Sequence, residues 1–237
     1  MKRLSCALAG GLFVVLHGAT LAGSTRPRLV AGIAIPRTPL ALKAEDHIRS
    51  VEPEFLFNHS SRTYVFGALR LKALGVTYNP ETAYVAALFH DLGLVPTAAS
   101  RDRSFEIDGA DQAAAFVKAN GGTPEQARIV WNAVVMHDLG RAYQSHQSPE
   151  ALLVGGGAAG DVNGVDPKLI APELVEEVLR AYPRLAFKRR FIETATNHCR
   201  RKPTSQIGWL DVLCREIVPN ADRGSVEEGI DSAPFAE

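Results

Sequence analysis

Apolar residues recur at three- and four-residue spacing along most of the chain after Glu45. Ala83, Ala86 and Ala87 show this spacing in the segment that leads to His90. Such a period places the apolar side chains on one face of an α-helix. No alternating run of Val, Ile or Thr is long enough to predict a sheet, and the sequence contains no internal repeat. The pattern therefore predicts an all-α fold.

Helix start signals separate the apolar segments. Asn79-Pro80 combines an N-cap residue with proline at the first helical position, and Thr123-Pro124-Glu125-Gln126 adds the glutamine of a capping box. Similar signals occur at Asp108, Ser148-Pro149 and Asp166-Pro167. These positions predict where successive helices of a bundle begin, and Asp108 is expected to act as a helix cap.

Three segments fall outside this helical pattern. Residues 24–44 contain three prolines and no helical period, which indicates a linker or irregular arm. Residues 155–157 are all glycine and are expected to form a loop, but this loop lacks the Lys-Ser/Thr and the preceding strand of a phosphate-binding loop. Residues 221–237 are acidic and contain Gly and Ser, which is typical of a flexible tail. A single helical domain is therefore expected over residues 45–220.

The first 23 residues have the layout of a secretory signal peptide. A short basic start, Met1-Lys2-Arg3, precedes an apolar stretch without acidic residues, and small residues suit cleavage after Ala22 or Gly23. The stretch is short for a membrane span, and the alternatives are an uncleaved anchor or a frayed helix. We expect a periplasmic or secreted protein without stable membrane association after cleavage. The protein would be cytoplasmic if this segment is not a signal.

The charge balance argues against nucleic acid as a partner. Lys and Arg together number 26, as do Asp and Glu, so the chain has no net charge to attract a polyanion. A small molecule with little charge fits this balance better. At 237 residues the chain has room for one well-packed domain, and its large helical faces are compatible with a homodimer.

Three cysteines are too few for a disulfide framework. Cys6 would leave with the signal peptide, so Cys199 and Cys214 would remain. We expect two buried thiols at these positions. A disulfide between them is the alternative in an oxidising compartment.

The segment ALFHDLGL places His90 and Asp91 side by side within an apolar run. Burying two such polar groups costs free energy unless each finds a partner. His59, His137 and Asp161 also lie in or beside apolar stretches. One such histidine is usually a hydrogen-bonded core residue, but three of them with two aspartates favour a metal site. A helical bundle can bring these residue types from several helices to one ion.

The order of these residues resembles that of the HD superfamily of metal-dependent hydrolases, an all-α fold named for the His-Asp pair. Over roughly residues 52–218 the chain is similar to the cyanamide hydratase branch, which adds water to the nitrile of cyanamide to give urea. The segments that carry the resemblance are NHSSRTYVFG, YVAALFHDLGL, SFEIDGADQAAAFV, VWNAVVMHD and GDVNG.

The resemblance implies one divalent ion, with Zn as the first candidate and Fe or Mn as alternatives. Its implied ligands are His59, His90, Asp91 and Asp161. His137 would be a further ligand or a catalytic residue that transfers protons.

Arg62 is a second catalytic candidate because it follows His59 by three residues, on the same face of a helix. It is expected to pair with a carboxylate or to hold the substrate, and a surface ion pair is the alternative. Glu106 and Asp108 follow the His-Asp pair along the chain, and the role of Glu106 is left open.

Two reactions compete for this site. A hydratase would direct a metal-activated water to a small nitrile such as cyanamide, whereas a phosphohydrolase would act on a nucleotide or phosphate ester. Phosphate recognition needs cations near the metal, and Arg62 is the only one embedded in the mostly apolar ligand segments. The sequence therefore favours the hydratase. A helical module that binds metal without catalysis is the third reading.

Overall fold

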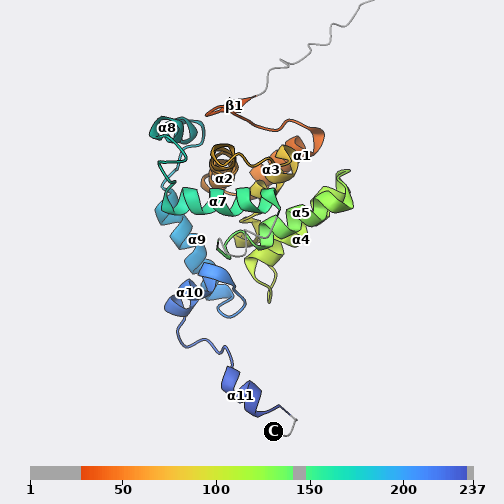
Figure 1. The fold of residues 1–237 in the computed structure, drawn as a ribbon. Helices are drawn as coiled ribbons and strands as arrows, with labels where there is room; N and C mark the ends of the chain where they lie inside the picture. Colours follow the sequence, from red (N-terminus) through yellow and green to blue (C-terminus); the bar gives the residue numbers. More distant parts are fainter. Residues whose placement is uncertain (1–27, 141–147, 234–237) are drawn as a thin grey trace, which may run out of the picture.

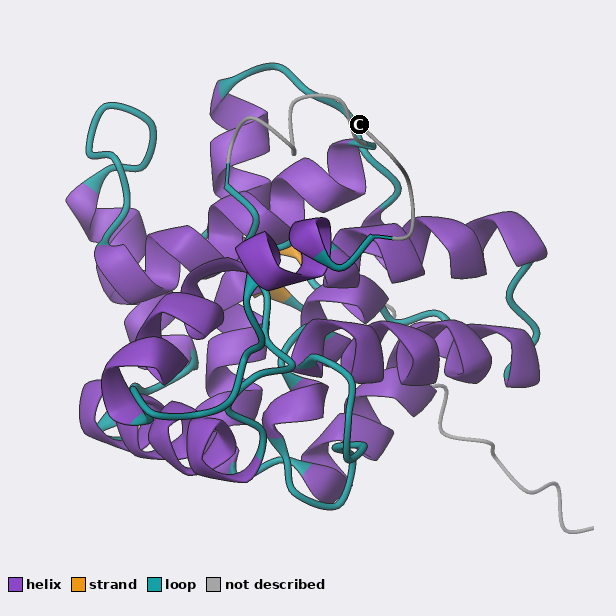
Figure 2. Cartoon of the chain, turned by 90° about the horizontal axis from the view of Figure 1, so that it is seen from below, coloured by secondary structure: helices purple, strands orange, loops and turns teal. Residues whose placement is uncertain are grey.

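The computed structural model describes residues 28–140 and 148–233, and within them the chain is all-α, as predicted (Figure 1). A short antiparallel pair of strands, β1 (Leu29–Val30) and β2 (Ile33–Ala34), lies at one edge of the helical bundle (Figure 1) and behind the helices in the view of Figure 2. The described helices are α1 (Pro39–Val51), α2 (Glu54–Ala73), α3 (Pro80–Phe89), the 3-10 helix η1 (Leu92–Leu94), α4 (Phe105–Ala119), α5 (Pro124–Val135), α7 (Pro149–Asn163), α8 (Pro172–Ala181), α9 (Phe187–Arg201), α10 (Gly208–Ile217) and α11 (Val226–Asp231).

Helices α2 and α7 form the centre of the molecule and pack along each other. Helices α3, α4 and α5 lie to one side of this pair, whereas α8, α9 and α10 lie on the other (Figure 1). Every residue of α2 from Phe55 to Leu69 is buried, so this helix is surrounded on all sides. Because this buried stretch includes histidine and arginine, their polar atoms must find partners inside the protein.

Several helix starts agree with the sequence signals. The side chains of Asn79, Thr123 and Ser148 cap α3, α5 and α7, and Gln126 completes the capping box of α5. The prediction for Asp108 is wrong, because Ser104 caps α4. Asp108 lies in the first turn of α4, where it accepts a hydrogen bond from the buried ammonium of Lys202 at 2.8 Å.

Other expected boundaries differ from the structure. Helix α1 begins at Pro39, inside the segment expected to be an irregular arm, because Thr38 caps it and proline occupies its first turn. No helix begins at Asp166-Pro167, and α8 starts only at Pro172. The segment expected to be a flexible tail contains the short helix α11. The predicted signal peptide, residues 1–23, lies outside the described residues.

The glycines at 155–157 do not form the expected loop; they lie within α7. A Cβ added at Gly157 would overlap the carbonyl oxygen of Thr63 on α2, and one added at Gly67 would overlap the carbonyl oxygen of Leu153. The absence of side chains therefore lets the backbones of α2 and α7 approach closely. This packing gain outweighs the intrinsic cost of about 1 kcal/mol for each glycine in a helix.

Cys199 and Cys214 form a disulfide with an S–S distance of 2.08 Å, so the expectation of two thiols is wrong. Helix α10 folds back on α9 and brings the two buried cysteines together, which sequence spacing alone could not indicate. The bridge ties α10 to the rest of the protein. None of the described helices is long and apolar enough to cross a membrane.

Candidate metal centre

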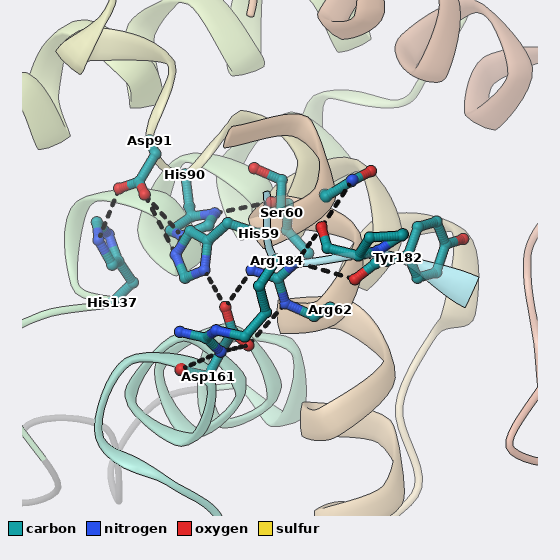
Figure 3. Close-up of polar contacts among 12 residues, drawn as sticks. His59, Ser60, Arg62, His90, Asp91, His137, Asp161, Tyr182 and Arg184 are labelled. Carbon is teal, nitrogen blue, oxygen red and sulfur yellow. Dashed lines mark hydrogen bonds and ion pairs between the residues drawn. The ribbon is translucent and has the colours of Figure 1, made fainter. Parts of the chain in front are cut away.

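Five of the predicted site residues meet near the centre of the molecule (Figure 3). His59 lies in the middle of α2, and His90 and Asp91 directly follow α3. His137 follows α5 by two residues, and Asp161 lies in the last turn of α7. All five side chains are buried. Four separate helical segments therefore contribute to one polar cluster inside the fold.

His59, His90 and Asp91 bring three potential ligand atoms together. The Nε2 atoms of His59 and His90 are 3.2 Å apart, and Asp91 Oδ2 lies 3.3 Å and 3.4 Å from them. Two nitrogen ligands that each lie about 2.0–2.1 Å from one zinc ion are separated by a similar distance. Within the described residues these three form a group that could hold a metal ion.

The remaining ring nitrogens define how the two histidines are protonated. His90 Nδ1 donates to the carbonyl oxygen of Ala87 at 2.8 Å, and His59 Nδ1 donates to Asp161 Oδ2 at 2.7 Å. When both rings are neutral, each presents the lone pair of Nε2 to the other ring and to Asp91. Asp91 Oδ2 is buried and accepts no hydrogen bond from the described residues. Three electron-rich atoms at this separation could hold one cation, so the donor set fits a divalent metal ion.

The electrostatics of the cluster support the same interpretation. Burial lowers the pKa of His90 to about 3, which keeps its ring neutral. Burial alone would raise the pKa of Asp91, but the neighbouring histidines outweigh it and hold the pKa below its ordinary value. Burial would likewise lower the pKa of His59, but Asp161 and Asp91 outweigh it and raise that pKa. His90 is thus available as a neutral imidazole and Asp91 as a charged carboxylate. His59 would have to lose a proton in order to bind a metal.

Asp161 lies on the other side of the His59 ring from the three ligand atoms. Arg62 donates to both carboxylate oxygens at 2.7 Å and 2.8 Å, and Arg184 donates to Oδ1 at 2.9 Å. Burial would raise the pKa of Asp161, but the hydrogen bonds from His59 and Arg62 keep it low. The resemblance implied that Asp161 is a metal ligand. The structure places it against Nδ1 of His59, whereas His90 and Asp91 lie against Nε2.

Arg62 is fully buried and does not line the cavity described below. Besides Asp161, it donates to the carbonyl oxygens of Tyr182 and Pro183 at 3.0 Å and 3.2 Å. Arg62 therefore pairs with a carboxylate, which is one of the roles expected for it. Arg184 was missed by the sequence analysis, because nothing in its loop between α8 and α9 indicates that the chain returns to Asp161.

His137 lies on the opposite side of the ligand group. Its Nδ1 donates to the carbonyl oxygen of Val134 at 2.6 Å, and its Nε2 lies 3.7 Å from Asp91 Oδ1. The ring packs edge-on against His90 with centroids 4.9 Å apart. His137 is therefore close enough to act on a molecule bound beside the ligand group.

The ligand group lies at the wall of a cavity of about 700 Å³. Besides His59, His90, Asp91 and His137, its wall is formed mostly by residues of α7, α9, α10 and the segment after α7. Glycine and alanine of α7 supply part of the surface, which explains how a helix at the centre of the fold leaves space beside it.

A second acidic pair, Glu106 and Asp138, lies beside the cavity and was not predicted from the sequence. Glu106 is fully buried, and neither of its carboxylate oxygens accepts a hydrogen bond from the described residues. Burial and the neighbouring Asp138, which lines the cavity, raise the pKa of Glu106 to about 9. Glu106 is therefore protonated at neutral pH and can donate to Asp138. The acidic residue after His137 was the available sequence signal.

Comparison with known proteins adds no relative: no model of a protein family matches the chain, and no curated protein matches it. The fold and the site thus define the protein as an all-α protein with a buried candidate metal centre beside a cavity.

Proposed function

We propose that this protein is a metal-dependent hydratase of the HD type, which adds water to the nitrile group of a neutral molecule such as cyanamide. The observation that carries the proposal is the convergence of His59 Nε2, His90 Nε2 and Asp91 Oδ2 at the wall of a cavity. The resemblance of the surrounding motifs to the cyanamide hydratase branch supplies the reaction.

Imidazole and carboxylate donors suit Zn, and also Fe or Mn. Three protein ligands leave coordination positions open, as catalytic metal sites require. When bound, such an ion lowers the pKa of a water molecule to roughly 7, so that hydroxide is available at neutral pH.

Asp161 orients His59 in this proposal. By accepting the proton of Nδ1 it keeps Nε2 unprotonated and fixes the plane of the ring. Arg62 and Arg184 hold the carboxylate in place from two directions. The three residues therefore act on the metal ligand rather than on the substrate.

His137 moves the proton. Hydration of a nitrile forms one bond between the water oxygen and the nitrile carbon, and both hydrogens of water end on the nitrogen. Since Nδ1 of His137 donates to the backbone, Nε2 is the atom that would carry a proton from water to nitrogen.

A phosphohydrolase is the competing proposal, and the charges near the site weigh against it. The guanidinium groups of Arg62 and Arg184, which lie beside His59, are both bound to Asp161. Asp138 and Asp166 add acidic groups to the cavity wall, where they would repel a phosphate. Arg70 also lines the cavity, so the two reactions must be separated by experiment.

Elemental analysis of the purified protein tests the metal first. We expect about one divalent ion per chain, and His90→Ala should lose both the ion and stability because binding energy of a metal is also folding energy. His47→Ala removes a histidine that stacks on Phe89 outside the ligand group and should keep the ion. Less than about a tenth of an ion per chain, with no activity restored by Zn, Fe or Mn, would contradict the proposal.

The reaction is tested by incubating metal-loaded protein separately with cyanamide and with a panel of nucleotides and phosphate esters. We expect urea from cyanamide, retained in His47→Ala and abolished in His90→Ala. Release of phosphate without formation of urea would replace the hydratase by the phosphohydrolase.

We also propose that the protein is exported. The Cys199–Cys214 disulfide supports this location, since disulfides persist in oxidising compartments. Intact-mass measurement on protein from its native host should find a mature chain that begins near Gly23 or Ser24. A full-length chain would refute cleavage.

A further inference from the structure

The cavity changes in character from its inner end to its mouth. The inner end is formed by the buried, polar side chains of His59, His90 and Asp91. The outer part contains Val162, Ile192 and Trp209, which are 40%, 61% and 38% exposed. These exposed side chains come from α7, α9 and α10. A polar, reactive end thus continues into an apolar opening that three helices share.

A row of rings connects the two ends. The centroid of Phe191 lies 5.5 Å from that of His59 and 5.8 Å from that of Trp209. Phe191 and Trp209 both line the cavity, so the apolar wall is continuous from a metal ligand to the exposed mouth. The disulfide between α9 and α10 holds the two helices that carry these rings against each other. The disulfide and the ring contacts therefore fix the apolar wall in the fold.

The size of the cavity exceeds what cyanamide needs. Pockets of about 300–1,000 Å³ hold drug-sized molecules in other proteins, and the cavity here measures about 700 Å³. Cyanamide has only three non-hydrogen atoms, so it would leave most of the apolar wall in contact with water. Outside the ligand group, the charged groups of the wall are of both signs, Arg70 against Asp138 and Asp166, which favours an uncharged occupant.

We propose that the substrate is an uncharged molecule whose apolar body fills the cavity along Phe191 and Trp209 and whose reacting group lies at His59, His90 and Asp91. The identity of the reacting group, a nitrile, rests on the proposed function. The apolar body rests on the cavity alone. Cyanamide is then the smallest substrate rather than the preferred one.

Steady-state kinetics with metal-loaded full-length protein tests the proposal on N-alkyl cyanamides of increasing length, from cyanamide to N-butylcyanamide. Each buried methylene contributes about 0.8 kcal/mol, so KM should fall about fourfold with each one. Since the added carbons do not touch the reacting atoms, kcat should change little. A KM that stays constant or rises along the series would overturn the proposal.

Two matched variants locate the effect. Ile192→Ser removes an apolar side chain from the mouth, whereas Val212→Ser changes a residue of similar exposure, 58% against 61%, that does not line the cavity. Ile192→Ser should raise the KM of N-butylcyanamide at least fivefold more than that of cyanamide, which corresponds to roughly one to two methylenes. Val212→Ser should leave both values as in the wild type. Equal behaviour of the two variants would refute the placement.

A binding measurement separates this proposal from the reaction. Calorimetric titration of the full-length protein as purified with N-butylurea and with urea requires no turnover, and we expect at least about tenfold tighter binding of N-butylurea. If no nitrile is hydrated but N-butylurea binds more tightly, the hydratase proposal fails and the apolar site stands. If cyanamide is hydrated but the two ureas bind alike, the hydratase stands and the apolar site fails.

Discussion

Replacing Glu106 by Gln should stabilise the protein, and increasingly so as the pH rises. Glu106 is fully buried beside Asp138, and burial and this carboxylate raise its pKa to about 9. The folded protein therefore keeps a proton on Glu106 that the unfolded chain releases. Glutamine has the same shape, donates from its amide to Asp138, and has no proton to lose.

The size of the effect follows from the two pKa values. The unfolded glutamate has a pKa of about 4.3, so below that pH both states are protonated and nothing is lost. Between the unfolded value and the folded value near 9, the unfolded state binds fewer protons, and the stability of the wild type falls as the pH rises. Each pH unit in this window costs at most about 1.4 kcal/mol, a cost that Glu106→Gln does not share.

Urea denaturation of chelator-treated protein at about pH 5.5 and about pH 8 measures the difference, which should grow by up to about 3 kcal/mol in favour of Glu106→Gln. The metal is removed because metal binding itself depends on pH and would contribute to the difference. Glu125→Gln is the control, because Glu125 is exposed and paired with Arg128. A difference between Glu106→Gln and the wild type that is independent of pH would show that Glu106 is ionised in the folded protein, and the reasoning would be wrong.

Two further predictions concern what holds the site in place. Reduction of the Cys199–Cys214 disulfide, which spans 15 residues of sequence, should lower the free energy of unfolding by about 3 kcal/mol. An unchanged denaturation midpoint with reductant would show that the bridge contributes nothing. Arg62→Lys loses the paired hydrogen bonds to Asp161 and should weaken metal binding about 10- to 100-fold in competition with a chelator. Unaltered affinity would mean that the orientation of His59 does not depend on this pair.

The sequence determined much of the local structure. Periodic apolar residues indicated helices, and the side chains of Asn79, Thr123 and Ser148 cap three of them as predicted. These signals are readable because a cap and its helix lie within a few residues of each other. The buried polar residues of the candidate site were also recognisable, since an adjacent His90 and Asp91 in an apolar run need partners.

Signals that depend on packing were misread. The glycines at 155–157 have low helix propensity, and only the contact between α7 and α2 explains why they are helical. Cys199 and Cys214 pair because α10 folds back on α9, which their spacing does not reveal. Arg184 has no distinctive neighbours in the sequence, and its role appears only where its loop reaches Asp161.

The geometry of the candidate site was decided by the tertiary structure. His59 is 31 residues from His90 and 102 residues from Asp161, yet its Nε2 atom contacts His90 and its Nδ1 atom contacts Asp161. Residue types alone made all of them candidate ligands. Which atoms converge depends on the close packing of α2 against α7, which puts the Asp161 carboxylate on Nδ1 and leaves Nε2 facing His90 and Asp91. Such long-range contacts come from the packing of whole helices, and no local sequence pattern specifies them.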